Sequence, residues 1–280
     1  MGVNRRDFLK VLGGTCASLA AGNSSEASQE KHNDVEFHGV LYDSTRCIAC
    51  QSCEYACAEK NSLPEPNDSV EAGVIRKTNE TRATAVSLFN TSKGEVPVKR
   101  QCMHCNDPAC ASACLTRAMY KTHEAPVIWR EDKCMGCRFC MISCPFDIPK
   151  FEYESTNPKI IKCTMCFDLI KEGGVPACVE SCPEEAIVFG TRRELIKEAR
   201  KRICEDPDLY VDHIYGEHEA GGTGWLYLSP VPFDEIGFNT NIQKSSYPAL
   251  TKGFISSIAP VDILLPALLL GIYEATKTKK

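Results

Sequence analysis

The sequence predicts an α+β fold, in which short strands and helices alternate with cysteine-rich loops and are followed by one long apolar helix. Three observations lead to this expectation. Of the 280 residues, 18 are cysteines, and most of these fall into four tight groups. Short apolar segments rich in β-branched residues lie between the groups, as is typical of strands. Near the C-terminal end, residues 253–273 form an apolar stretch with a single acidic residue.

Each of the four cysteine groups, here called quartets, ends in the spacing Cys-x3-Cys. The quartets comprise Cys47, Cys50, Cys53 and Cys57; Cys102, Cys105, Cys110 and Cys114; Cys134, Cys137, Cys140 and Cys144; and Cys163, Cys166, Cys178 and Cys182. Only Cys16 and Cys204 lie apart from them. The grouping predicts that the quartet cysteines act in sets.

Three kinds of chemistry use clustered cysteines: disulfides, zinc and iron–sulfur clusters. Disulfide frameworks are typical of short secreted chains that lack a core, whereas this chain is long and 43% hydrophobic. Zinc modules separate two Cys-x2-Cys pairs by a dozen or more residues. The first and third quartets instead have the bacterial ferredoxin spacing Cys-x2-Cys-x2-Cys-x3-Cys, whose fourth cysteine, expected at the start of a helix, binds a different cluster. The spacing therefore predicts four cubane [4Fe–4S] clusters, with all the quartet cysteines as ligands.

Secondary structure is expected mainly between the quartets. Strands fit residues 37–42, 126–130 and 185–190, whose apolar, β-branched character suits ferredoxin hairpins. Residues 70–99 separate the first two quartets and contain the segments VIRKT, TAVSLF and the start of EVPVKR. We expect these residues to form a β-rich insertion that covers clusters or contacts a partner.

After the fourth quartet, Thr191 opens a predicted helix, TRRELIKEARKRI. Its apolar face comprises Leu195, Ile196 and Ala199. Cys204 follows at the end of this helix and is expected to be an inert free thiol. Residues 206–252 are rich in Pro, Gly and Tyr, with little periodicity, so we expect an ordered extension that wraps its own modules or a neighbouring protein.

Residues 1–27 are interpreted as a twin-arginine export signal, which directs the export of folded proteins that already hold their cofactors. The arginine pair lies in the sequence NRRDFLK and precedes a weakly apolar run, VLGGTCASLAAG, and a polar segment. Cleavage is expected near Ala20 to Ala27. Cys16 lacks the apolar residue three positions earlier that a lipidation signal needs, so lipidation is not expected.

Residues 253–273 predict a single transmembrane helix, because about twenty helical residues span about 30 Å of hydrocarbon. The basic tail, residues 274–280, would then lie on the cytoplasmic side, as the positive-inside rule favours when the body of the chain is exported. Asp262 is costly in lipid, and Pro260 and Pro266 would kink the helix. A helix buried against partner subunits is the alternative to a membrane anchor.

Composition and missing motifs disfavour several classes of function. The net charge of −5, without a basic stripe, argues against nucleic-acid binding. The sequence has no nucleophile–base pair, phosphate-binding glycine loop or catalytic metal triad, so we expect no substrate site and no enzymatic activity of its own. His104 is interpreted as a hydrogen-bonding neighbour of its quartet rather than as a ligand. Basic residues next to cysteines either raise local potentials or are ordinary solvated charges; they are Arg46, Lys133 and Lys162.

Four stretches carry a resemblance to a known family: LYDSTRCIACQSCEYAC, KRQCMHCNDPACASAC, CMGCRFCMISCPFDIPKFEY and KCTMCFDLIKEGGVPACVESCPEEAIVFGTRREL. They resemble the four-cluster iron–sulfur subunits of membrane-bound respiratory oxidoreductases, such as dimethyl sulfoxide reductase, formate dehydrogenase and periplasmic nickel–iron hydrogenase. The resemblance covers residues 37–205. It is greatest to the subunit of menaquinone-linked periplasmic nickel–iron hydrogenase, through the sequences LYDST, GVPACVE, YGE and GGT and a Lys-Gly pair before the apolar helix.

The resemblance implies two bacterial-ferredoxin-like modules with two clusters each. Module A comprises residues 37–69 and 158–205, with the first and fourth quartets, and module B comprises residues 100–157. Each quartet would lend its fourth cysteine to the neighbouring cluster. The implied ligand sets are Cys47, Cys50, Cys53 and Cys182; Cys163, Cys166, Cys178 and Cys57; Cys102, Cys105, Cys110 and Cys144; and Cys134, Cys137, Cys140 and Cys114.

The resemblance also implies an electron relay on the periplasmic side of the cytoplasmic membrane. The relay would connect a catalytic subunit, or that enzyme's small iron–sulfur subunit, to an integral membrane quinone-binding subunit. Instead of a nickel–iron hydrogenase, the catalytic partner could be a molybdenum or tungsten enzyme such as formate dehydrogenase, or a sulfur-compound reductase. A freely diffusing polyferredoxin and a zinc-stabilised scaffold are alternatives of other classes.

Overall fold

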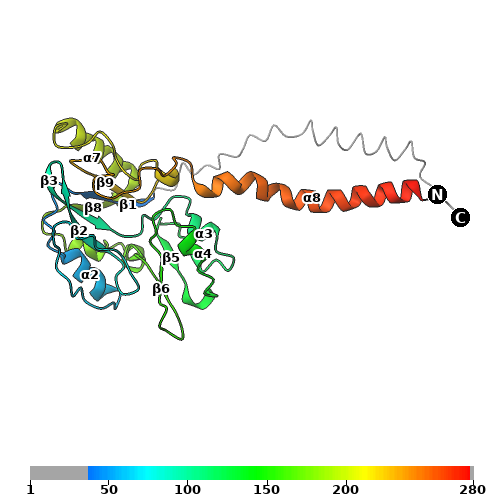
Figure 1. The fold of residues 1–280 in the computed structure, drawn as a ribbon, viewed down its shortest axis with the longest axis horizontal. Helices are drawn as coiled ribbons and strands as arrows, with labels where there is room; N and C mark the ends of the chain where they lie inside the picture. The colour runs from blue at the N-terminus through cyan, green and yellow to red at the C-terminus, as the bar shows by residue number, and fades with distance from the viewer. Residues whose placement is uncertain (1–36, 278–280) are drawn as a thin grey trace. The chain divides into compact units, whose positions relative to one another are not determined.

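The computed structural model describes residues 37–277 (Figure 1). The chain divides into two units, one that ends at Leu250 and one that contains the C-terminal helix from Thr251 onward, and each is described by itself. The predicted export signal, residues 1–27, lies outside the described residues, as do residues 278–280 of the basic tail.

The main sheet of the first unit joins three strands that are far apart in the sequence. Strand β1 (His38–Asp43) lies in the centre, antiparallel to β8 (Ile187–Thr191) and parallel to β9 (Trp225–Leu228). Val40 lies opposite Phe189 on one side and Trp225 on the other. The strands expected over 37–42 and 185–190 are confirmed, whereas β9 lies in the extension, where no strand is expected.

Helix α7 (Arg192–Glu205) packs against this sheet. Thr191 is its N-cap, and the Thr191 hydroxyl accepts a hydrogen bond from the Glu194 N–H at 3.4 Å. Leu195 and Ala199 are buried against Leu41, Leu226 and Leu228 of the sheet, with Ile196 partly buried beside them. The helix and its apolar face therefore lie where the sequence places them.

Two of the three β-prone segments between the first two quartets form strands. They are β2 (Ala85–Thr91) and β3 (Gly94–Arg100), which pair as an antiparallel hairpin. The segment VIRKT is not a strand, because its Arg76 forms backbone hydrogen bonds with the Ser87 hydroxyl instead of with a neighbouring strand. Both hairpin strands contribute buried residues to the core, so this part of the insertion is packed rather than projecting.

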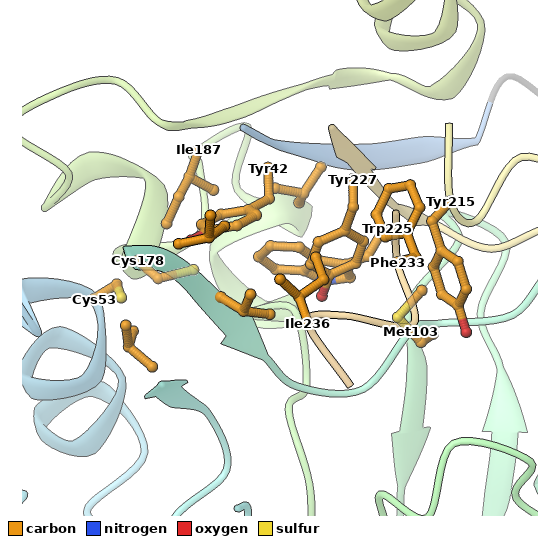
Figure 2. Close-up of a cluster of buried hydrophobic side chains, with 14 of the residues drawn as sticks. Tyr42, Cys53, Met103, Cys178, Ile187, Tyr215, Trp225, Tyr227, Phe233 and Ile236 are labelled. Carbon is orange, nitrogen blue, oxygen red and sulfur yellow. The ribbon is translucent and has the colours of Figure 1, made fainter. Parts of the chain in front are cut away.

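An aromatic core lies beneath the main sheet (Figure 2). Tyr42 of β1 and Trp225 and Tyr227 of β9 are each at most 2% exposed. Tyr215 and Phe233, from the segments that flank β9, pack beside them with ring centroids 5.2 Å apart. Residues 206–246 of the expected extension thus pack within the first unit and supply a strand and much of its core.

The remaining elements are short and lie next to the cysteine loops. They are α2 (Ser52–Lys60), α3 (Ala109–Ser112), β4 (Met119–Lys121), β5 (Val127–Trp129), α4 (Phe139–Ile142), β6 (Lys150–Phe151), β7 (Ile160–Ile161), α5 (Phe167–Lys171) and α6 (Ala177–Glu180), with 3-10 turns at Glu131–Lys133 and Glu219–Gly221. Strand β5 confirms the strand expected over 126–130; it pairs with β4, and β6 pairs with β7. Within the unit, α3, α4, β5 and β6 lie to one side of the main sheet (Figure 1).

The C-terminal helix, α8 (Tyr247–Thr276), begins six residues before the predicted start at Gly253. Its 30 residues correspond to about 45 Å of helix, more than the roughly 30 Å of a bilayer core. The helix runs through both Pro260 and Pro266, and none of its side chains is buried. Among the described residues it is the one helix that is long and apolar enough to cross a membrane.

Candidate iron–sulfur sites

The four quartet loops share one backbone feature. In each, the residue before the second cysteine has a positive φ: Ala49 (56°), His104 (50°), Gly136 (71°) and Met165 (55°). This conformation costs a residue with a side chain about 1–2 kcal/mol. Backbone that passes through it turns successive N–H groups into a concave nest, which is a common anion-binding geometry at iron–sulfur sites. The repeated strain therefore marks four equivalent binding loops.

The last two cysteines of each quartet bracket a turn of helix. The third cysteine lies in the helix, as Cys110 does in α3, and the fourth follows the helix end, as Cys114 does. Cys144 and Cys182 likewise follow α4 and α6, while Cys57 lies inside the longer α2. The expectation that the fourth cysteine begins a helix is therefore wrong, because the spacing Cys-x3-Cys spans the helical turn itself.

One cavity is lined by cysteines from both ends of module A. Its walls include three cysteines of the first quartet and the last cysteine of the fourth quartet, namely Cys47, Cys50, Cys53 and Cys182. The remaining walls are mainly apolar, with Tyr42, Val86 and Ile187. The enclosed space is about 350 Å³, open solvent at the mouth included.

A second cavity repeats this arrangement in module B. It is lined by Cys134, Cys137 and Cys140 of the third quartet and by Cys114, the last cysteine of the second quartet. Met119, Trp129 and Ile160 complete its apolar walls, and the space is about 330 Å³ on the same basis. In both cavities, three thiols come from one loop and the fourth comes from another quartet.

The other eight quartet cysteines gather in two further sets. Cys57 has Cys178 and Cys166 as electrostatic neighbours, and Cys163 has Cys57 and Cys178. In module B the corresponding set is Cys102, Cys105, Cys110 and Cys144, since Cys105 interacts electrostatically with the other three.

The four sets follow one another in a row. Electrostatic neighbours link adjacent sets: Cys53 with Cys178, Cys163 with Cys102, and Cys110 with Cys140. The four cysteines of the set that contains Cys57 are all buried. The two end sets each contain one exposed cysteine, Cys50 and Cys137. The row therefore has two accessible ends, and its two middle sets contain no exposed cysteine.

The quartet thiols are poorly placed to ionise on their own. Burial raises the pKa of Cys57 and of Cys110 to about 12, and of Cys140 and Cys144 to about 11. A bound iron centre would favour the thiolate forms, because a coordinating thiol is deprotonated outright. All the described cysteines are free of disulfides. Buried free thiols in sets of four suit a group that supplies positive charge.

His104 supports the same interpretation. It is fully buried, and its Nδ1 accepts a hydrogen bond from the Val127 N–H at 2.9 Å. Its Nε2 therefore carries the hydrogen, yet this buried atom has no partner among the described residues. Burial, together with the charges of Lys162 and Lys121, lowers the pKa of His104, so the ring is neutral. A donor without an acceptor, next to Cys105, fits the sulfur of a cluster.

A site for a single metal ion needs its ligands closer together than the ligands of a multi-iron cluster. Within residues 37–277, no three His, Cys, Asp or Glu side chains lie close enough together to hold one metal ion. The cysteines of each set lie farther apart than the ligands of one ion, and in two sets they line the same cavity. The residues present thus fit a multi-iron cluster.

Of the three basic residues singled out in the sequence, only Lys162 is buried among the sites. Its ammonium group donates hydrogen bonds to the backbone carbonyls of Val127 and Cys163. Arg46 lies 3.7 Å from Asp43, and Lys133 is exposed. The sequence gives no hint of a second buried ammonium group, that of Lys99, which is 1% exposed. No local motif could have revealed it, because its burial depends on the packing of β3.

Comparisons with known proteins agree with this geometry. Residues 96–192 match the model of a 4Fe-4S dicluster domain. A protein of Nitratidesulfovibrio vulgaris is 44% identical over 99% of this chain and 78% of its own length. The hydrogenase-2 operon protein HybA of Escherichia coli O157:H7 is 34% identical over 84% of this chain and 83% of its own length. The chain belongs to the family of [4Fe–4S] subunits of respiratory oxidoreductases.

A more distant relative points the same way. The iron–sulfur subunit of the nitrate-inducible formate dehydrogenase of Escherichia coli K12 is 32% identical over 67% of this chain and 66% of its own length. As a member of this family, the chain is an electron-transfer subunit that carries iron–sulfur clusters. The family resemblance inferred from the quartets is confirmed, and so is the relay function.

Proposed function

We propose that this subunit holds four [4Fe–4S] clusters, two in module A and two in module B, on the four cysteine sets described above. The observation that carries the proposal is that both open cavities combine three thiols of one quartet with the last thiol of another. Because a fourth cysteine that crosses between clusters is the ferredoxin arrangement, the spacing and the geometry support the same ligand sets.

The sets form a linear wire with an entry and an exit. Bound clusters supply one-electron redox chemistry. The cysteines of the middle sets are buried or half-buried, while Cys50 and Cys137 are exposed at the two ends. Exposed end sites favour exchange with partner proteins, and buried middle sites favour transfer along the chain. No group suited to substrate chemistry is required, so the subunit has no reaction site of its own.

The membrane-facing end is proposed to be the one that contains Cys137. The Ser246 hydroxyl, one residue before α8, donates a hydrogen bond to Asp107 of module B at 2.5 Å. Large apolar side chains are exposed around the same set, where soluble proteins rarely gather them; they are Leu115, Met135, Phe139 and Ile142. The end of the first unit, at Ser246, is therefore bound to module B, which fits an integral membrane partner there.

The proposed partners follow from the family. The similarity to HybA supports a periplasmic nickel–iron hydrogenase, or its small iron–sulfur subunit, at the Cys50 end and a quinone-binding membrane subunit at the other. A molybdenum or tungsten enzyme is the second candidate, since formate dehydrogenase subunits are also similar. Helix α8 would anchor the subunit in the cytoplasmic membrane, with the body exported by the twin-arginine route to the periplasmic side.

Ligand exchange between quartets gives the sharpest test of the four-cluster proposal. The wild-type subunit should contain about sixteen irons and show four clusters by low-temperature EPR after reduction. Cys57→Ser should affect the cluster of Cys163, Cys166 and Cys178, and Cys182→Ser that of Cys47 and its neighbours. Cys204→Ser is the matched control with an exposed thiol outside the sets. Damage by Cys57→Ser that is confined to the cluster of Cys47 would contradict the assignment.

Partners and anchoring need the intact complex. Mass spectrometry of the detergent-solubilised complex should detect a hydrogenase subunit and a membrane subunit. Phe139→Glu should release the membrane subunit and leave the catalytic subunit bound, whereas Tyr55→Glu, an exposed position in module A, should not release the membrane subunit. Release of the full-length protein by carbonate would argue against the membrane anchor, and purification as a lone soluble protein would argue against the subunit itself.

A further inference from the structure

Lys99 is a fully buried lysine in the middle of module A's cysteines. It comes from β3, and its Nζ donates hydrogen bonds to Thr84 Oγ1 at 2.6 Å and Gln101 Oε1 at 2.9 Å. The same Nζ lies 4.7 Å from the centre of the Trp225 ring. Gln101 is fixed in turn by a hydrogen bond to the Tyr227 hydroxyl. The ammonium group is therefore held in one position.

These contacts do not neutralise the charge. Among residues 37–277, no carboxylate pairs with Lys99, and its hydrogen-bond acceptors are a hydroxyl and an amide. An isolated buried ammonium group is costly unless an opposite charge compensates it. Buried arginines nearby do have such partners, as Arg76 has Glu54. The fold thus retains a buried positive charge for which the polypeptide provides no acidic partner.

Cysteines of two different sets lie beside this charge. Val86, the cross-strand partner of Lys99, lines the cavity that contains Cys53. Trp225, whose ring contacts the Lys99 ammonium group, packs in the same hydrophobic cluster as Cys53 and Cys178. Lys99 interacts electrostatically with Cys53, of the set at the module A cavity, and with Cys57, Cys163 and Cys178, of the neighbouring buried set. The Lys99 ammonium group therefore faces both sets of module A.

We propose that Lys99 is a charge-compensating residue that raises the reduction potentials of both module A clusters together. This inference rests on the four-cluster proposal. In the reduction step, one electron enters a cluster, no bond forms or breaks, and Lys99 neither gains nor loses a proton. The added negative charge is stabilised by the fixed ammonium group, more strongly in a buried, low-dielectric site than in water. Two neighbouring clusters are thereby kept reducible in spite of their mutual repulsion.

Lys162 provides a natural contrast within the same protein. It interacts electrostatically with Cys110 of the buried module B set, and its hydrogen bonds hold it between Val127 and Cys163. Lys162 is thus suited to act on the neighbouring module B cluster, whereas Lys99 acts on the module A pair. Replacement of Lys162 should therefore change the potential of a module B cluster, and replacement of Lys99 should change the potentials of the module A clusters.

The test is an EPR-monitored redox titration of the purified full-length complex. Lys99→Met and Lys99→Gln remove the charge, Lys99→Arg keeps it, and Lys77→Met removes an exposed lysine of the same insertion. In both neutral variants we expect two of the four midpoint potentials to fall by at least about 59 mV, a tenfold change for a one-electron step. The other two midpoints should stay in place, as should all four in Lys99→Arg and Lys77→Met.

The outcomes separate the two proposals. Wild-type protein with fewer than four clusters would count against the proposed function, whatever Lys99 does. With four clusters present, unchanged midpoints in a neutral variant would overturn the role of Lys99. Equal shifts in Lys99→Arg and Lys99→Met would also overturn it, because they would indicate altered packing rather than lost charge. Loss of iron from both neutral variants would assign Lys99 to assembly and likewise overturn the proposal.

Discussion

Modules A and B use the same cysteine loop but support it differently. The first and third quartets have identical spacing, and Ala49 and Gly136 take the same left-handed conformation at the same place in the loop. In module A the loop lies against the main sheet and its aromatic core, which includes Trp225 and Tyr227. In module B the corresponding hydrophobic core has few buried residues other than cysteines: Met119, Val127, Phe151 and Ile160.

This difference separates what the loop requires from what the surrounding fold contributes. A binding loop needs its spacing and its strained backbone, and both modules provide these. Module A has long-range strand pairing with β8 and with β9 of the extension, whereas module B relies on the two-stranded pair β4–β5 and on β6, which pairs with β7 at the start of module A's second segment. Two-stranded ribbons are marginal in water. The clusters themselves must therefore supply much of module B's core.

Iron removal should give the largest difference between the modules. After anaerobic chelation, we expect the amides of β4, β5, β6 and β7 to lose nearly all protection against hydrogen exchange. The amides of β1 and β8 should keep most of theirs, because the aromatic core persists without clusters. Hydrogen-exchange mass spectrometry resolves the two sets of peptides. Equal loss of protection in both modules would show that module A also depends on its clusters for folding.

Arg76→Met should produce the next largest effect, on module A alone. Arg76 donates hydrogen bonds to both oxygens of Glu54, which lies between Cys53 and Cys57 in α2 and is 2% exposed. The variant leaves Glu54 without its main partner, which should cost about 3–5 kcal/mol. The midpoint for thermal loss of the visible absorption of the clusters should fall, with module A iron lost first.

Two further variants make this test specific. Lys77→Met, next to Arg76 but exposed, should leave the midpoint unchanged. The double variant Arg76→Met with Glu54→Leu should recover most of the lost stability, because replacing both partners of a buried pair is often nearly neutral. A double variant as unstable as Arg76→Met would show that the loss is caused by packing rather than by the unpaired carboxylate.

Substitutions at the left-handed loop position that both modules share, Gly136 and Ala49, should have a smaller effect on stability. Gly136→Ala places a Cβ where the nearest atom is 4.0 Å away, so the cost is backbone strain alone, about 1 kcal/mol. Ala49→Gly relieves strain in the native loop but adds freedom to the unfolded chain, so the net change should be near zero. Thermal loss of cluster absorption measures both. A Gly136→Ala variant as stable as the wild type would show that the loop geometry is relaxed in the loaded protein.

What the sequence could predict is mostly local. The quartets, the cap at Thr191 and the strand over 37–42 depend on near neighbours in the chain, and spacing or periodicity reveals them. Strand β9 could not be predicted, because it has four residues, lies in a Gly- and Pro-rich segment and pairs with a strand at the other end of the unit. Helix α8 starts earlier than the apolar stretch indicates, because Tyr247 and the residues after it are less apolar than those from Gly253.

The candidate sites also combine local features that the sequence reveals with features that depend on long-range packing. The loops and their thiols are sequence features, and the residue most informative about potential, Lys99, is not. In an alternating strand, Val96 and Val98 predict one buried face, and Lys99 belongs to the opposite one. It is nevertheless buried, because the hairpin is covered on both faces, and only packing across the whole unit produces that. Residues that affect the reduction potential of a site without binding it therefore cannot be recognised from the local sequence pattern.

The smallest expected effect concerns pH and the segment that precedes β9. His213 lies 2.8 Å from Glu219, whose hydrogen bond and charge raise the pKa of His213 above its ordinary 6.5. Burial would raise the pKa of Glu219, but the hydrogen bond from His213 and those from backbone N–H groups lower it below 4.5. A raised histidine pKa stabilises the fold fully below pH 6.5, and this contribution is lost as the pH rises through the folded-state value.

The stabilisation by His213 should therefore decline as the pH rises above about 6.5, and it should amount to less than about 1 kcal/mol because the His213 side chain is 46% exposed. The thermal midpoint measured across this range should fall in the wild type. In His213→Gln, which cannot become charged, that part of the slope should vanish, while in His123→Gln, outside this pair, it should remain. An unchanged slope in His213→Gln would assign the pH dependence to other groups and leave module A's sheet independent of the pair.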